Sequence, residues 1–324
     1  MKFFARVPNI DFMAQRKVGL WVSAILTAVA LGLLAVRGLN LGIDFTGGVL
    51  VEVTYPQSVQ LDDVRDSLAK GGFERAVVQY FGSSSAVLIR LAPQEGKQAS
   101  QVSGAVMEAL RAQQTGIELR RVEFVGPQVG EELTEKGLLA LLLAFGAIGI
   151  YILFRFEWKF SIGAIMALIH DAIMVLGFLS LTWVEFDLTT LGAILAMIGY
   201  SNNETIVIFD RVRENFRQMR RAAVDTLEVI NLSVNQTLLR SVITHLTTLL
   251  VLTTLYLVGG SSVHSFSVAF IVGVIVATYS SIYISCGTIV LLGVSREDLL
   301  PPKPEELEEK LQKAAAARSS QRPR

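Results

Sequence analysis

The sequence predicts a polytopic α-helical membrane protein, with six transmembrane helices and one extracytoplasmic α+β domain between the first two. Two observations indicate this fold class. Hydrophobic residues make up 52% of the 324 residues and charged residues only 18%, whereas soluble domains carry about 25% charged residues. The chain also contains six apolar runs of about the length that a membrane-crossing helix requires, roughly 20 residues.

The first predicted span covers residues 18–36 and follows a basic segment, residues 1–17. A retained anchor is favoured over a cleaved signal peptide, because the run exceeds the roughly 7–15 residues of a signal-peptide core and Arg37 closes it without a cleavage site. The tail 293–324 is expected to be partly helical at best and disordered at its end. The other spans belong to a five-helix segment, 136–292, and cover about 136–154, 161–183, 188–209, 236–258 and 265–292.

Basic residues predict that both termini are cytoplasmic. The amino-terminal segment and the loop 155–159 are basic, and the loop 211–235 carries five arginines before residue 222. The loops on the opposite side carry Glu185 and Asp187 or, at 259–262, no charge. Because positive charges accumulate in cytoplasmic loops, the three basic segments fall on one side. The loop 211–235 predicts either a helix along the membrane surface or a solvated linker.

Residues 38–134 predict one small extracytoplasmic domain. Alternating and helical patterns follow one another in the order βαββαβ, which is that of a ferredoxin-like split motif. The three serines at 83–85 are interpreted as the hairpin between the second and third strands. This motif hosts many functions, so it indicates no chemistry by itself. The predicted elements are 49–55, 61–72, 76–82, 86–92, 97–114 and 118–126.

No motif for nucleotide hydrolysis or covalent catalysis occurs in the sequence. Gly96-Lys97 lacks the earlier glycine and the following Ser or Thr of a phosphate-binding loop, and no zinc spacing or nucleophile elbow is present. The single cysteine, Cys286, is most simply a small packing residue in the last apolar run. We therefore expect no enzyme activity, no cofactor, no metal site and no nucleic-acid partner.

Ionisable side chains inside the predicted spans are the main functional signal. Glu204 lies roughly 10 Å below the inner boundary, Arg240 about 8–12 Å deep, and His170-Asp171 roughly 16–18 Å in, from the rise of 1.5 Å per residue. The sequence therefore allows Glu204 and Arg240 to meet at one level. Ionisable groups in a membrane usually face a protein interior and mark an ion, proton or substrate path.

Two interpretations of this polar set remain open. A buried carboxylate beside a cation can change its protonation state with its surroundings, so it can carry a proton; the alternative is a static ion pair that only holds helices together. Asn203 is either part of the path or ordinary interhelical hydrogen bonding. Gly192, Ala196, Gly199 and Asn203 form one stripe that predicts close helix packing, and His245 is a weaker candidate.

Several segments together resemble the SecF family of the bacterial Sec protein-export system, within the resistance-nodulation-division superfamily. They span most of the chain, which makes their combination specific. The segments are LGIDFTGG (41–48), ALIHDAIMVLG (167–177), GYSNNETIVIFDRVRENF (199–216), NQTLLRSVITHLTTLL (235–250) and FIVGVIVATYSSIYIS (270–285). Asp44, Gly47 and Gly48 belong to the first segment, and its glycines fit a sharp backbone turn where the chain enters the extracytoplasmic domain.

The resemblance implies a subunit of the bacterial inner membrane that pairs with SecD and uses the proton-motive force in late-stage preprotein translocation. The implied partners are SecD, the SecYEG channel, YajC, YidC and the translocating preprotein. Glu204, Arg240, His170 and Asp171 map onto the family's proton-coupling residues, although this chain has Asn202-Asn203-Glu204-Thr205 where many members have Leu-Asn-Asp-Thr. Rival hypotheses are a small-molecule/proton antiporter subunit and an inert assembly factor; sodium coupling also stays open.

Overall fold

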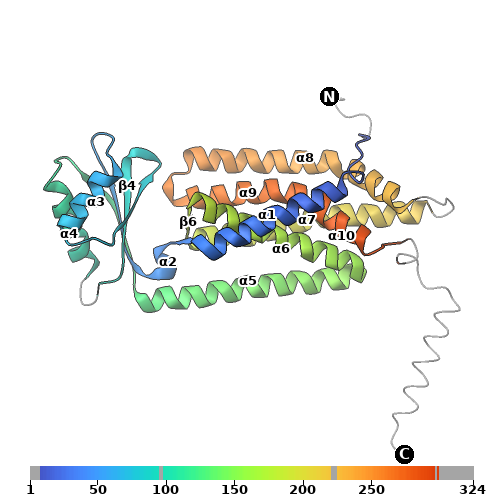
Figure 1. Cartoon of the computed structure of the whole chain (residues 1–324), viewed down its shortest axis with the longest axis horizontal. Helices are drawn as coiled ribbons and strands as arrows, with labels where there is room; N and C mark the ends of the chain where they lie inside the picture. The colour runs from blue at the N-terminus through green and yellow to red at the C-terminus, as the bar shows by residue number, and fades with distance from the viewer. Residues whose placement is uncertain (1–7, 95–97, 220–224, 296–297, 299–324) are drawn as a thin grey trace, which may run out of the picture.

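The structure, a computed structural model, describes residues 8–94, 98–219, 225–295 and residue 298. A bundle of long helices forms most of the molecule, and a small α+β domain covers one end of it (Figure 1). The predicted partial helix and disorder of the tail beyond residue 298 lie outside the described residues.

The bundle is built from helices that match the positions of the predicted spans. They are α1 (Arg16–Arg37), α5 (Pro127–Arg155), α6 (Trp158–Thr182), α7 (Leu188–Gln218), α8 (Thr226–Val258) and α9 (His264–Ser280), which continues through the π-helical turn η2 (Ser281–Ser285) into α10 (Cys286–Leu291). Five of these segments are long and apolar enough to cross a membrane, and α7 is not among them. Three consecutive polar residues, Asn202, Asn203 and Glu204, interrupt its apolar run.

Three of these helices are longer than predicted. Helix α5 begins at Pro127 rather than 136, α7 ends at Gln218 rather than 209, and α8 begins at Thr226 rather than 236. The prediction of a surface helix or a linker over 211–235 was therefore wrong, since 211–218 and 226–235 continue the long helices. Hydropathy locates the apolar part of a helix, whereas polar contacts can extend it: Asn215 Nδ2 donates to Ser233 Oγ at 2.8 Å, which joins the extensions of α7 and α8.

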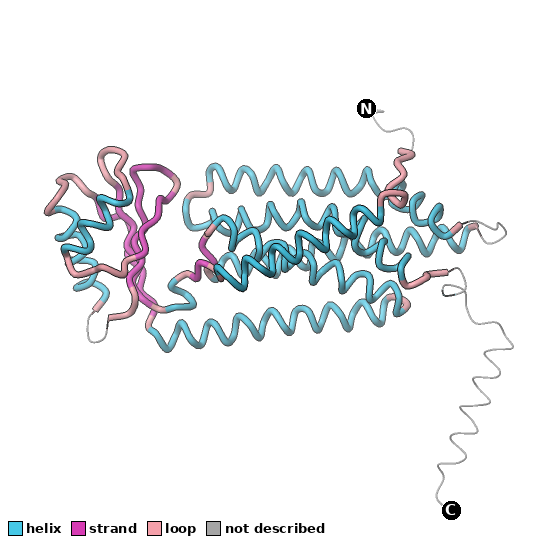
Figure 2. The backbone as a smooth tube through the Cα atoms, in the orientation of Figure 1, coloured by secondary structure: helices cyan, strands magenta, loops and turns pink. Residues whose placement is uncertain are grey.

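The α+β domain contains strands and helices in the predicted order. The strands β2 (Gly48–Thr54), β3 (Val77–Phe81), β4 (Ser83–Leu91) and β5 (Glu118–Val125) form an antiparallel sheet in the order β3-β4-β2-β5. Helices α3 (Leu61–Lys70) and α4 (Ala99–Arg111) cover the face of the sheet away from the bundle (Figure 2). Alternate residues of β2 and β4, such as Val51 and Ile89, are buried against these helices. The hairpin turns at Gly82, with φ +74°, so the three serines belong to β4 rather than to the turn.

A second, two-stranded sheet joins the domain to the bundle. Strand β1 (Asn40–Leu41) pairs in parallel with β6 (Glu185–Phe186), which lies in the connection between α6 and α7. The short helix α2 (Ile43–Thr46) follows β1, and the N–H of Gly42 between them donates to the carbonyl of Phe186 at 2.9 Å. The chain that enters the domain is thereby fixed to the connection just before α7.

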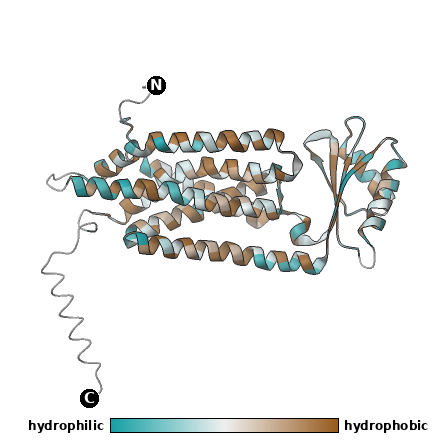
Figure 3. Cartoon of the chain, turned by 180° about the vertical axis from the view of Figure 1, so that it is seen from behind, coloured by the Kyte–Doolittle hydropathy of each residue, from teal (hydrophilic) through white to brown (hydrophobic). Residues whose placement is uncertain are grey.

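The surface of the bundle is apolar, and its hydrophobic interior also contains buried polar side chains. Large exposed side chains such as Trp21, Leu143 and Val251 cover the outer faces of α1, α5 and α8, and hydrophobic colours dominate the middle of the helices (Figure 3). Phe160 and Phe209 pack edge to face at 5.0 Å between ring centroids inside the bundle. An apolar exterior around buried polar side chains is the pattern of a helical bundle in lipid.

Candidate functional site

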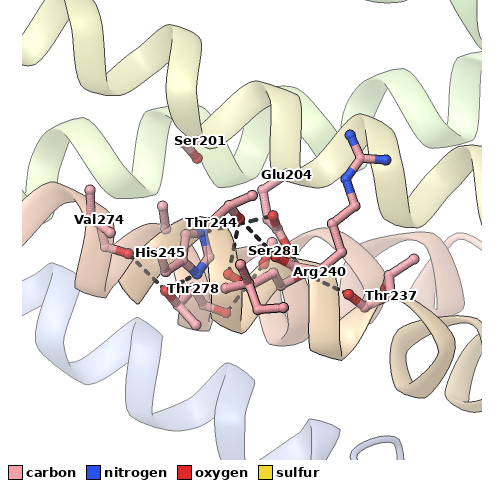
Figure 4. A network of polar contacts seen from close by, with 12 residues as sticks. Ser201, Glu204, Thr237, Arg240, Thr244, His245, Val274, Thr278 and Ser281 are labelled. Carbon is pink, nitrogen blue, oxygen red and sulfur yellow. Dashed lines mark hydrogen bonds and ion pairs between the residues drawn. The ribbon is translucent and has the colours of Figure 1, made fainter. Parts of the chain in front are cut away.

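Glu204, on α7, is buried at the contact of three helices. Its side chain accepts a short hydrogen bond on Oε1 from Ser241 Oγ of α8. Its other oxygen, Oε2, lies 3.7 Å from Nε2 of His245, one turn further along α8. Both α8 residues are buried and face α7 because residues four apart share one side of a helix. Figure 4 shows Glu204 and His245 side by side at this contact.

His245 links this carboxylate to α9. Its Nδ1 lies 2.8 Å from Thr278 Oγ1, and the same hydroxyl donates to the carbonyl of Val274 at 2.8 Å. The ring of Tyr200, on α7, lies 5.5 Å from the imidazole between centroids. A continuous polar chain therefore runs from α7 through α8 to α9 (Figure 4).

Asp171, on α6, is a second buried carboxylate with partners on three helices. Its Oδ2 accepts from Ser201 Oγ of α7 at 2.5 Å and from Ser280 Oγ of α9 at 2.9 Å. Nδ1 of the neighbouring His170 lies 3.1 Å from Oδ1. Ser280 is the last residue before the π-helical turn η2, and such turns occur often at functional sites because they redirect side chains.

The networks around the two carboxylates both include residues of α7 and α9. Ser201 precedes Glu204 by one turn of α7, and Ser280 follows Thr278 on α9, so the two networks lie at neighbouring levels. Several buried polar atoms around them have no hydrogen-bond partner among the described residues. They are His170 Nε2, Tyr200 Oη, Asn202 Oδ1 and His245 Nε2. Unpaired buried polar atoms are unusual, and they are positions where water or a mobile proton can be accommodated.

Arg240 does not contact Glu204 among the described residues, although the sequence allowed the two to meet. Its side chain is exposed at the bundle surface, and within the described part of the chain it has no acidic partner within 4.0 Å. The rise per residue predicts how far along a helix a residue lies, but not the direction in which its side chain points. Consecutive helical residues point about 100° apart, and Ser241 is the residue that faces α7. Figure 4 shows the guanidinium lying away from the carboxylate.

Asn203 is likewise exposed, and its neighbour Asn202 is the buried asparagine. The small-residue stripe of α7 ends with Asn203, and added Cβ atoms at Gly192 and Gly199 would meet no atom within 4 Å. The close packing predicted for this stripe is thus not made within the described residues. Gly273 of α9 does pack closely, since a Cβ there would lie 2.2 Å from Met197 Cγ.

At the end of the bundle next to the α+β domain, Asp44 connects the domain to α7. The N–H of Leu188, the first residue of α7, donates to Asp44 Oδ2 at 2.9 Å. Gly47 and Gly48 follow with φ of +67° and +123°, and a Cβ on Gly48 would lie 2.2 Å from the carbonyl oxygen of Leu91. These glycines allow the chain to turn from α2 into β2 at close range.

A buried arginine strengthens the same junction. Arg90 of β4 is 7% exposed, and its guanidinium donates to the carbonyl of Leu41 at 2.6 Å and to Asn40 Oδ1 at 2.5 Å. Its Nη1 also lies 3.5 Å from Glu185 Oε1 on β6. Burial raises the pKa of Glu185, and the nearby Arg90 opposes that rise.

Sequence reasoning underrated His245 and missed Ser241, Ser201, Ser280 and Arg90. The signal for the first pair was available, because Ser241 and His245 are four residues apart and share one face of a helix. Serines in an apolar helix also bond back to their own backbone, so the sequence did not distinguish Ser201 or Ser280. No group of three or more His, Cys, Asp or Glu residues suited to a metal occurs in the described residues.

Comparison with known proteins identifies the family. The profile described as "Protein export membrane protein SecD/SecF, C-terminal" matches residues 105–295, and the profile "SecD/SecF GG Motif" matches residues 32–59. The chain belongs to the SecD/SecF family. The GG-motif match contains Asp44, Gly47 and Gly48, and the larger match contains both buried carboxylates.

Relatives in this family align along most of the chain. A Pseudomonas aeruginosa protein named "Protein translocase subunit SecF" is 49% identical over 298 residues, which cover 92% of this chain and 96% of that protein. The protein of the same name from Escherichia coli O157:H7 is 42% identical over 297 residues, which cover 91% of each. These names and the apolar helices show a multi-pass membrane protein of the SecF type.

Solved structures of SecDF share the fold. The crystal structure of SecDF from Thermus thermophilus, a translocon-associated membrane protein, has a TM-score of 0.80 and 35% identity over 88% of this chain. The super-membrane-facing form of SecDF has a TM-score of 0.65 and 34% identity over 95% of this chain. This chain covers only 39% and 40% of those two chains, respectively.

Proposed function

We propose that this chain is an accessory subunit of the Sec protein translocase. In this proposal it pairs with SecD and uses the proton-motive force to promote late-stage preprotein translocation. Relatives that it matches nearly end to end are named as translocase subunits, and the matched SecDF chains contain a further part of more than half their length. SecD supplies that further part here, while SecYEG, YajC, YidC and the preprotein are partners by family resemblance.

The exposed polar surface of the bundle supports a partner inside the membrane. Arg240 and Asn203 are exposed on helices whose other exposed residues are largely apolar or small. An arginine facing lipid costs several kcal/mol, so it usually faces protein or water instead. Gly192 and Gly199 leave room for the close approach of another helix. We assign this surface to contact with SecD.

Glu204 is the proposed proton carrier, and its position is the observation that carries the proposal. It is buried at the meeting of α7, α8 and α9, beside a titratable histidine and near polar atoms without partners. One proton that moves through 100 mV releases about 2.3 kcal/mol. That energy is sufficient to shift the equilibrium between two arrangements of α7, α8 and α9, because contacts among these helices depend on the Glu204 carboxylate.

Helix α7 connects this site to the extracytoplasmic domain. It begins at the Asp44 contact and reaches Glu204 after sixteen residues, about 24 Å along the helix axis. Because β1–β6 and Arg90 hold the same junction, a shift of α7 on protonation would move the base of the domain. The sheet and its two helices, which we assign to the ferredoxin-like class, would then follow α7.

The proposed topology places all six helical segments across the bacterial inner membrane with both termini inside. The inner end of the bundle carries the basic residues, and Arg155 pairs there with Asp210 at 2.7 Å. α7 crosses despite its polar residues because they face the bundle interior or the proposed SecD surface. Glu204 and Ser201 of α7 are then kept from lipid.

The test is Glu204→Gln in the complex with SecD. Membrane vesicles are prepared with a preprotein arrested part-way through translocation. The completion of its translocation is then followed with and without a proton-motive force. We expect the variant to bind SecD normally and to lose most of the proton-dependent stimulation. The matched control is Glu214→Gln, an exposed carboxylate on the same helix that pairs with Arg211, and it should behave as the unchanged protein does.

Two outcomes would favour the rival functions. Full stimulation in Glu204→Gln with normal SecD binding would make the buried network an inert structural contact. A small-molecule/proton antiporter would instead show changed sensitivity to toxic compounds on deletion, without accumulation of precursor proteins. Replacing the proton gradient by a sodium gradient in the same vesicles distinguishes the two coupling ions.

A further inference from the structure

The Glu204 carboxylate faces one basic side chain, and it is not an arginine. In the part of the chain that the structure describes, His245 is the only cationic group within 4.0 Å of it. The other groups turned toward the imidazole are Tyr200 of α7 and Thr278 of α9. His245 is 5% exposed and Glu204 7% exposed, so both are shielded from bulk solvent.

The contacts of Thr278 are consistent with one tautomer of the imidazole, in which the nitrogen nearer the carboxylate is an acceptor. A threonine hydroxyl has one hydrogen to donate, and Thr278 gives it to the carbonyl of Val274 at 2.8 Å. With that bond kept, this oxygen accepts toward His245 Nδ1, also at 2.8 Å, and the tautomer with its hydrogen on Nδ1 satisfies both contacts. In the neutral ring Nε2 is then a lone pair, and it is the atom 3.7 Å from Glu204 Oε2.

We propose that Glu204 and His245 hold one proton in common, and that this pair is the unit that loads and releases the transported proton. The inference rests on the proposed function and names His245 as the second half of its site. When the pair is empty, the carboxylate is charged and the imidazole is neutral. When it is loaded, the proton lies on Oε2 or on Nε2, and the pair carries no net charge in either case.

The distance between the two atoms fits this exchange. A separation of 3.7 Å exceeds an ordinary hydrogen bond, and in the empty pair two lone pairs face each other. A proton between them creates a charge-assisted or neutral hydrogen bond, which favours about 2.8 Å. Loading therefore draws α7 and α8 together at this level, and release lets them separate. His245 Nε2, which has no hydrogen-bond partner among the described residues, is the atom that can accept that proton.

The first experiment follows both groups by spectroscopy in the full chain with SecD in lipid nanodiscs. Ring nitrogens of 15N-labelled histidine report His245, assigned by the loss of its signal in His245→Gln, and the infrared carbonyl band of a protonated carboxyl group reports Glu204, assigned with Glu204→Gln. We expect the two signals to change with one shared pH midpoint, because strongly coupled groups titrate as a pair.

Each substitution must then alter the titration of the remaining partner. Glu204→Gln should move the His245 transition by at least one pH unit, and His245→Gln should do the same to the carboxyl band. The control Glu214→Gln should leave both signals in place. Separate midpoints that ignore the partner's substitution, or a His245 ring that stays neutral throughout, would overturn the inference.

The vesicle assay, which follows the completion of preprotein translocation, distinguishes failure of this inference from failure of the proposed function. In His245→Gln we expect the pH optimum of proton-dependent stimulation to shift by at least one unit, a change that a purely structural histidine would not cause. If Glu204→Gln abolishes stimulation while the pH profile of His245→Gln is unchanged, the shared proton is refuted and the proposed function stands. If Glu204→Gln stimulates normally, the proposed function itself fails.

Discussion

Replacing Arg90 with methionine should loosen the junction between the domain and the bundle. The guanidinium holds Leu41 and Asn40 of β1 and lies 3.5 Å from Glu185 of β6. Methionine keeps the apolar stem of the side chain and removes every one of these contacts. The buried carboxylate of Glu185 is then left without its cation.

The size of the effect follows from these contacts. Removing one partner of a buried ion pair costs about 3–5 kcal/mol, and each hydrogen bond from a charged donor contributes about 1.5–3 kcal/mol. Because the ion pair is long and Glu185 can take up a proton, we expect the low end, about 3 kcal/mol of local opening free energy. This corresponds to a roughly 100-fold increase in opening.

Amide hydrogen exchange in the SecD complex measures this opening directly. The N–H of Gly42 is bonded to Phe186 across β1 and β6, so its exchange should accelerate about 100-fold in Arg90→Met. The control is Arg120→Met on β5, whose guanidinium is largely exposed and pairs with the equally exposed Glu118. It should change the rate less than about threefold, because exposed ion pairs contribute little.

The effect should depend on pH with a definite sign. Burial already raises the pKa of Glu185, and loss of Arg90 raises it further. The folded junction then binds a proton more tightly than the open one, so its stability falls as pH rises from the unfolded pKa through the folded pKa. Because the intrinsic exchange rate itself rises with pH, the comparison uses protection, the ratio of the intrinsic to the observed rate. Protection of the Gly42 N–H in Arg90→Met should be greater at pH 5 than at pH 8. An exchange rate near that of the unchanged protein at pH 8 would refute the assigned role of Arg90.

Two further predictions concern the domain itself. Gly48→Ala should lower the stability of the domain by at least about 3 kcal/mol, because φ is +123° and the new Cβ would lie 2.2 Å from the Leu91 carbonyl oxygen. The control, Gly104→Ala on the exposed face of α4, should raise the stability by up to about 1 kcal/mol. Thermal unfolding measures both changes. Burial raises the pKa of Tyr55 to about 12, so a phenolate transition near pH 12 should disappear in Tyr55→Phe, and its persistence there would contradict the assignment.

Much of the architecture could be predicted because it depends on local patterns. Apolar runs of about 20 residues specify long helices in any context that excludes water. The alternation in Val49–Val53 and the serine-rich hairpin likewise determine strands, although the turn proved to be at Gly82. Helix ends were misplaced because polar contacts between helices, such as Asn215 with Ser233, extend them beyond the apolar part.

The sequence by itself determined the helical membrane class and the βαββαβ order, since these follow from the length of apolar runs and from periodicity. Only the tertiary structure decided which residues at one depth meet. The rotation of each helix about its axis is set by packing against its neighbours, and it turns His245 rather than Arg240 toward Glu204. For the same reason Asn202 lies inside and Asn203 outside, although they are adjacent in the chain.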